Sequence, residues 1–154
     1  MNKDTQRKYD FMKFELNKLE KLYKNTVRDI SNIDAESEFR SFCSQCYHFK
    51  DWLIAEFPKQ KKDIEKYISN NEWLSICADF TNKDKHQNLD KYPRHQEDVG
   101  HGNNHIAINF TEKGFEVNSR YEVKVGNQKI DSLKVAQESF NAWNKYLAGN
   151  NINN

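Results

Sequence analysis

Along the first half of the chain, apolar residues recur at steps of three and four positions, which is the period of an amphipathic helix. The pattern predicts four helices, over residues 5–30, 35–57, 59–68 and 72–86. Segment 31–34 separates the first two, and Asp34 is a suitable N-cap for the second. Pro58 should end the second helix, because the residue before a proline is driven out of helical geometry.

The period changes in the second half. Residues 87–104 are polar and contain Pro93 and two glycines, so the sequence predicts a long loop there. From residue 105 to about 126, apolar and polar positions alternate, which is typical of strands, and Gly114 offers a turn between them. Helical spacing returns over residues 132–147 and stops at Gly149.

These elements predict a mainly α fold, a bundle of about five helices with a small antiparallel β-hairpin or meander inserted before the last helix. The β element, at about residues 105–126, is too small to hold a core of its own. We therefore expect a single domain over residues 1–149, followed by a flexible tail at 150–154.

Composition narrows the classes of partner. Hydrophobic residues make up 36% of the 154 and aromatic residues 13%, so large side chains help to fill the core. The net charge of +1 gives no global field that would attract nucleic acid or a membrane surface. An RNA partner would need a local basic patch, and basic residues gather in two places: Lys59, Lys61, Lys62 and Lys66, and again Lys83, Lys85, Lys91 and Arg94.

The same composition favours a cytoplasmic protein without a membrane association. No stretch approaches the roughly 20 apolar residues of a membrane span, and the first ten residues have no apolar core of the signal-peptide kind. Three cysteines are an odd number, which suggests reduced thiols.

Two predicted helices carry unusual polar faces. Because a helix turns about 100° per residue, His48 and Asp51 share a face opposite the apolar stripe of the second helix. Asp79, Asn82 and His86 share a face of the fourth helix in the same way, with Lys85 at its margin. Solvated faces of amphipathic helices look like this too.

Two observations favour a functional interpretation of these faces. Tyr47 and Trp52 flank the His48 and Asp51 face, where solvent exposure alone does not call for aromatic side chains. A carboxylate that orients a neutral imidazole is also the usual support for general acid–base chemistry.

The segments His48-Phe49-Lys50-Asp51-Trp52 and Asp79 to His86 resemble a group of bacterial proteins with a His-x-x-Asp-Trp segment and an Asp-x-x-Asn-x-x-Lys-His segment. The last helix, with Ala136 and Trp143, is similar to the C-terminal part of that group. The group is in turn similar to HEPN proteins, helical bundles found in toxin and antiviral-defence ribonucleases and in their non-catalytic partners. The resemblance covers about residues 39–147 and implies a homodimer whose polar helix faces meet across a cleft.

For a metal-independent ribonuclease, the resemblance implies a catalytic set of His48, Asp51, Asp79, Asn82, Lys85 and His86. The two histidines would exchange protons with the ribose 2′-hydroxyl and the leaving oxygen, and Lys85 would stabilise charge on the phosphate. The HEPN signature is an Arg followed by a polar residue and then, after a total gap of four to six residues, by a His, and residues 79–86 contain no Arg. The formal match, Arg94 and His101, falls in the predicted loop.

Other motifs predict less. Cys43 and Cys46 form a Cys-x-x-Cys on the apolar stripe of the second helix, which is typical of core cysteines. The remaining histidines fit no standard metal site, and no cofactor or metal is expected.

Two functions are therefore left open. The first is an RNA-binding protein or ribonuclease, whose polar faces should form one open cleft with basic residues around it. The second is a non-catalytic module that pairs with itself or with another protein, in which Tyr47 and Trp52 should lie in a flat contact surface. The distance between His48 and His86 should discriminate between them.

Overall fold

The computed structural model describes residues 1–24, 34–85, 93–112 and 114–152, apart from the side chains of residues 84, 85 and 111. Within them it contains five α-helices, one short 3-10 helix and a three-stranded sheet. In chain order these are α1 Lys3–Tyr23, α2 Ala35–Glu56, η2 Pro58–Gln60, α3 Lys61–Asn70, α4 Glu72–Lys85, β1 Val99–Thr111, β2 Gly114–Val125, β3 Gln128–Asp131 and α5 Ser132–Gly149. The prediction of a mainly helical chain with a small antiparallel β element before the last helix is confirmed.

Local capping explains where the helices begin. Asn2 accepts hydrogen bonds from the backbone N–H groups of Asp4 and Thr5, and Asp34 caps α2 in the same manner. Asp131 does so for α5, where it accepts from Leu133 and Lys134. Each cap satisfies backbone donors that have no partner within the helix.

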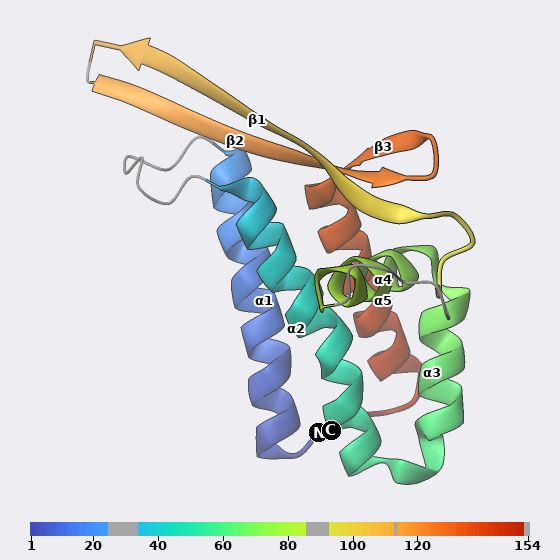
Figure 1. The fold of residues 1–154 in the computed structure, drawn as a ribbon. Coiled ribbons are helices and arrows are strands. Elements are labelled where there is room, and N and C mark those ends of the chain that lie inside the picture. Colours follow the sequence, from blue (N-terminus) through green and yellow to red (C-terminus); the bar gives the residue numbers. More distant parts are fainter. Residues whose placement is uncertain (25–33, 86–92, 113, 153–154) are drawn as a thin grey trace.

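The core lies between α1, α2, α4 and α5, beneath the sheet (Figure 1). Aromatic side chains fill it: Phe49 meets Trp143 edge to face, and Phe39 meets Phe80 in the same way. The Trp143 indole N–H donates to the Cys46 carbonyl, so this large side chain is buried with its polar atom satisfied. The prediction of core cysteines is confirmed, since the side chains of Cys43, Cys46 and Cys77 are buried.

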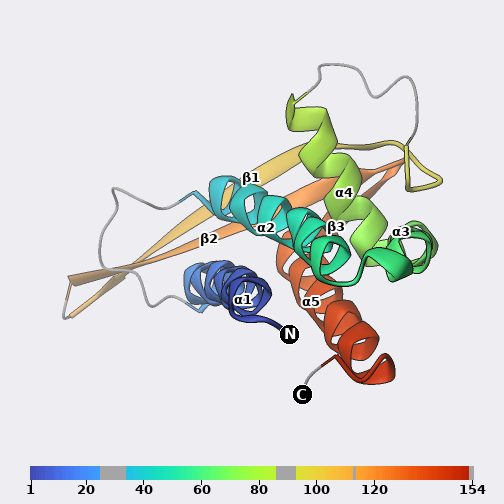
Figure 2. The same ribbon diagram turned by 90° about the horizontal axis from the view of Figure 1, so that it is seen from below.

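The sheet lies across one end of the helices in the order β1-β2-β3, with both pairs antiparallel. Tyr121, Val123 and Val125 of β2 are buried in the core, so the sheet is anchored on the helices at its base. Beyond this base, β1 and β2 extend past α1 as a two-stranded ribbon (Figures 1 and 2). We call this ribbon, β1 from residue 103 and β2 up to residue 119, the arm.

The loop prediction was wrong at its end, because β1 already begins at Val99. The two glycines belong to the strand, where the pairing with β2 shifts between Gly100 and Asn103. At Gly102 an added Cβ would lie 1.7 Å from the Glu122 carbonyl oxygen, so glycine permits the close approach of the strands. Glycines are typical of turns in a sequence, but here they allow an irregular pairing of two strands.

The C-terminal segment, predicted to be a flexible tail, packs on the fold as far as residue 152. Ile152 is buried, and its carbonyl accepts a hydrogen bond from the Met1 amino group at 2.8 Å. The two ends of the chain therefore lie side by side, as Figure 1 shows. Residues 153–154 lie outside the described part of the chain.

Three further predictions fall wholly or partly outside the described residues: the extension of the first helix over 25–30, the break at 31–33 and the loop over 87–92. In the helices that are described, none combines the length and apolarity needed to cross a membrane.

Candidate functional site

The first predicted pair is formed on α2. His48 and Asp51 are separated by one helical turn, and the imidazole Nδ1 lies 3.2 Å from Oδ2 of the carboxylate. Both side chains are partly exposed to solvent. The sequence prediction that these two residues share one face is confirmed by this hydrogen bond.

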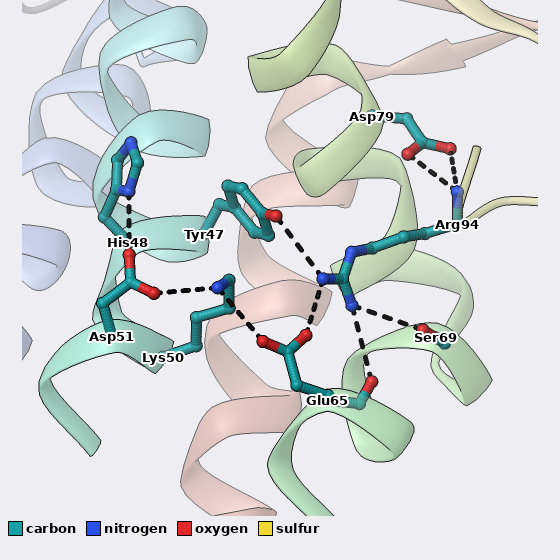
Figure 3. Close-up of polar contacts among 8 residues, drawn as sticks. All are labelled: Tyr47, His48, Lys50, Asp51, Glu65, Ser69, Asp79 and Arg94. Atoms are coloured by element: carbon teal, nitrogen blue, oxygen red, sulfur yellow. Dashed lines mark hydrogen bonds and ion pairs between the residues drawn. The ribbon is translucent and has the colours of Figure 1, made fainter. Parts of the chain in front are cut away.

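Lys50, between them on the same helix, extends the pair toward α3. Its Nζ donates to Asp51 at 2.8 Å and to Oε1 of Glu65 at 3.2 Å (Figure 3). The lysine is buried along its length, which is unusual for this residue type unless the charge is paired.

Glu65 continues the chain of contacts. Its second carboxylate oxygen lies 2.6 Å from Nη2 of Arg94, in the segment that precedes β1. The Arg94 guanidinium also donates to the Tyr47 hydroxyl and to the Ser69 hydroxyl. The Tyr47 ring lies close to two cations, 4.9 Å from Lys50 Nζ and 5.4 Å from the Arg94 guanidinium carbon.

Asp79 on α4 meets the backbone of the same segment. Its two oxygens each accept the Arg94 N–H at 2.9 Å, and Oδ2 accepts the His95 N–H at 2.7 Å. The prediction that Asp79 faces away from the core was wrong, because its exposed fraction is 1%. The reason is that α4 is buried on every side from Leu74 to Thr81. The prediction had assumed that only one stripe of this helix is buried.

The structure therefore joins two predicted segments through residues that the sequence prediction did not include. We call the set His48, Asp51, Lys50, Glu65, Arg94, Tyr47 and Asp79 the polar network (Figure 3). Lys50 is adjacent to Asp51, but Glu65 and Arg94 come from positions 15 and 29 residues away from their partners. No local spacing signals such contacts.

The other predicted catalytic residues, Asn82, Lys85 and His86, are not among the residues of the polar network. Asn82 is half-buried on α4. The Lys85 side chain and the whole of His86 lie outside the described residues, and so does the distance from His48 to His86.

Electrostatics in the polar network favour the charged forms. Burial acts to raise the pKa of Asp51, but hydrogen bonds from Lys50 and His48 outweigh it and hold the pKa below its usual range. The pKa of Glu65 is also lowered, because contacts with Arg94 and Lys50 exceed the effect of burial. Lys50 and Arg94 remain protonated. Burial acts to lower their pKa values, but the contacts with the carboxylates outweigh it and raise them.

Asp79 behaves differently. Burial raises the pKa of this carboxyl, and the hydrogen bonds from the Arg94 and His95 backbone only partly offset that effect. A carboxylate that accepts backbone N–H groups in this way fixes the path of a segment. Asp79 therefore anchors residues 94 and 95 to α4.

A cleft of about 380 Å³ opens beside this anchored segment. Its walls come from the end of α3, the start of α4, segment 94–97 and the β2–β3 turn region, including Ser69, Glu72, Arg94, His95, Glu97 and Gln128. His48 and Asp51 are not part of its lining. This cleft is thus separate from the exposed end of the polar network.

The formal Arg94 and His101 match is not formed as a pair at a helix start. His101 lies in β1, where its Nδ1 is 3.2 Å from Glu36 and its ring packs on Phe80. Arg94 has its contacts with Glu65 and Tyr47 instead. Within the described residues, no group of three or more His, Cys, Asp or Glu side chains is arranged to hold a metal ion.

The arm carries a second feature, which the prediction did not single out. Phe110 pairs with Phe115, and Ile108 pairs with Val117, so their side chains lie on one face of the ribbon. Toward the tip this face is uncovered: the exposed fractions are 60% for Ile106, 50% for Ile108, 86% for Phe110 and 36% for Phe115. We call these four side chains the apolar face of the arm.

No protein-family model matches this chain, and no curated protein or solved structure is significantly similar to it. The interpretation of the site therefore depends on its geometry.

The two features differ in what they can do. In the polar network, the charges of Lys50 and Arg94 are paired with Glu65, and both cations contact the Tyr47 ring, so these groups hold α2, α3 and the 94–95 segment together. The exposed His48 and Asp51 pair retains the chemistry of an oriented imidazole. The arm offers an uncovered apolar surface, which is the usual mark of a contact with another molecule.

Proposed function

We propose that this protein is an interaction module, which pairs with a second protein chain through the apolar face of the arm. The observation that carries the proposal is the exposure of Ile106, Ile108, Phe110 and Phe115 on one face of a ribbon that extends past the helices. Two-stranded ribbons are marginal in water when they stand alone, and a covering partner would stabilise this one. The expected contact surface thus moves from Tyr47 and Trp52 to the arm.

The polar network supports the same proposal. Lys50 and Arg94, the two cations of the polar network, both form ion pairs with Glu65. Binding of a phosphate there would have to compete with a carboxylate for the same donors. A structural role for Lys50 and Arg94 favours an interaction module, because a ribonuclease would need such cations to bind phosphate. We place this module in the cytoplasm, where its three buried cysteines would stay reduced.

Site-specific photo-crosslinking tests the proposal. Phe110 is replaced by the photoreactive benzoylphenylalanine in one variant, and Asn109, an exposed residue on the opposite face of the same strand, in the matched control. Irradiation of expressing cells should give a covalent adduct of defined mass from position 110 and none from position 109. A probe at position 110 that forms no adduct, although its incorporation is verified by mass spectrometry, would contradict the proposal.

The exposed pair of His48 and Asp51 favours a second candidate, a HEPN-like RNA-binding protein or ribonuclease of toxin or antiviral-defence type. Its hydrogen bond orients the imidazole, which is what a general base requires. The test is RNA cleavage by the wild type, by His48→Ala and by His86→Ala, with His105→Ala on the arm as the control. Cleavage that is lost in the first two variants and kept in the control would support it, and cleavage unchanged by both substitutions would exclude the proposed chemistry.

A further inference from the structure

The apolar face of the arm continues the inner face of the sheet. Along β2 the side chains of Val117, Ser119 and Tyr121 are buried, whereas Phe115 at the tip is partly exposed. On β1 the side chains opposite them, Ile106 and Ile108, are at least half exposed. This face is thus buried along β2 as far as Val117, and it is exposed along β1 and at the tip.

The uncovered area is large for a single chain. The four exposed side chains present on the order of 500 Å² of apolar surface, near the upper end of the largest patches found on monomers. Two such faces in full contact would remove roughly 1,000 Å² from solvent, which is the lower limit for a specific interface between proteins.

We propose that a second copy of this chain covers the exposed part of this face, so that the β1 stripes of two arms pack against each other around a two-fold axis near Ile108. This inference rests on the proposed function, and it names the partner. Ile108 is the middle residue of the stripe on β1, with Ile106 on one side and Phe110 on the other. A two-fold axis there brings apolar side chains against apolar side chains along the whole stripe, as an isologous contact requires.

Charge is consistent with self-association and does not favour a charged partner. The apolar face contains no ionisable side chain, while Glu116 and Arg120 point to the other face of β2, by the alternation along a strand. With a net charge of +1, two copies repel each other only weakly. A second copy also offers the same area and the same composition, so that neither arm leaves apolar surface uncovered.

Sedimentation velocity on the purified chain tests this assembly. The wild type should sediment as a species of twice 18.3 kDa from low micromolar to submillimolar concentration. Ile108→Glu and Phe110→Ser should sediment as monomers, because each disrupts the stacked faces at an exposed position. Ala107→Glu adds the same charge to the same strand on the opposite face, and it should remain a dimer.

Mixing complementary variants makes the test specific to the two-fold contact. Ile108→Glu and Ile108→Lys should each be monomeric, and an equimolar mixture should recover the dimer because the opposite charges meet at the axis. Far-ultraviolet circular dichroism confirms that each variant is folded.

The outcomes separate this inference from the proposed function. A wild type that is monomeric at every concentration, or a dimer that Ile108→Glu and Phe110→Ser leave intact, overturns the second copy as partner. If position 110 then still crosslinks to a different chain, the interaction module stands and only its partner changes. If position 110 gives no adduct at all, both the interaction module and the second copy as its partner are contradicted.

Discussion

The Glu65 carboxylate lies 2.6 Å from the Arg94 guanidinium, and this ion pair joins α3 to the segment that leads into β1. Glu65 also accepts from Lys50 of α2, so one carboxylate holds together three parts of the chain. The same segment is fixed from the other side by Asp79 of α4. The contacts place β1, and with it the arm, relative to the helices.

Glu65→Gln should make the protein less stable at neutral pH and less sensitive to acid. Because Arg94 and Lys50 lower the pKa of Glu65 in the folded state, the unfolded chain binds the proton more readily. The stabilisation is therefore fully present above the ordinary pKa of glutamate and is lost as the pH falls through the lowered value. We expect Gln to reduce the free energy of unfolding by about 1–2 kcal/mol at pH 7.

Urea denaturation between pH 7 and pH 3 measures both effects. The difference between wild type and Glu65→Gln should shrink as the pH falls. Glu97→Gln, which removes a carboxylate that lines the neighbouring cleft, serves as the control. A difference that stays constant over the whole pH range would contradict the assigned role of this ion pair.

Asp79 should be a structural residue whatever the function of the protein. Asp79→Ala leaves the backbone N–H groups of Arg94 and His95 without their acceptor, and we expect a loss of roughly 2–4 kcal/mol in the free energy of unfolding. Asp79→Asn keeps one acceptor oxygen and should lose about half as much. Chemical denaturation gives both values, and an alanine variant as stable as the wild type would rule out the anchoring role.

His48→Ala should leave the stability almost unchanged. The pair with Asp51 is exposed, and exposed pairs of this kind contribute at most about 1 kcal/mol. Thermal unfolding should therefore place His48→Ala close to the wild type and far from Asp79→Ala. A large destabilisation would mean that His48 supports the fold, and any loss of RNA cleavage in this variant could then not be assigned to chemistry.

Gly102→Ala should disturb the start of the arm, since the new Cβ would meet the Glu122 carbonyl at 1.7 Å. Backbone must move to relieve this clash, and the expected loss of stability is about 2 kcal/mol or more. Gly100→Ala is the matched control, because its nearest neighbour is the end of the Lys83 side chain at 3.6 Å. Equal thermal midpoints for the two variants would contradict the close strand approach.

The sequence predicted the elements where a local signal exists. Asp34 and Pro58 bracket α2 as expected, and the alternation from Ile106 onward correctly predicted a hairpin. The spacing of His48 and Asp51 likewise predicted a pair that the structure forms.

The remaining features depend on contacts between distant segments. The pairing of Glu65 with Arg94 spans 29 residues, and the burial of Asp79 follows from the packing of other elements around α4. The glycines at 100 and 102 look like loop residues until the partner strand is known. The exposure of Phe110 could not be predicted from the sequence either. The alternation along β1 shows only that Phe110 lies on its apolar face, and whether the helices cover that face depends on the fold.

A second copy that covers the apolar face of the arm should slow backbone exchange there, and hydrogen–deuterium exchange measures this protection. Peptides from residues 106–111 and 114–117 are compared between wild type and Ile108→Glu at the same high concentration, with a peptide from α5 as the internal reference. We expect slower exchange in the wild-type arm, which becomes faster on dilution, and equal exchange of the α5 peptide in both proteins. Identical exchange of the arm in both proteins at every concentration would contradict it.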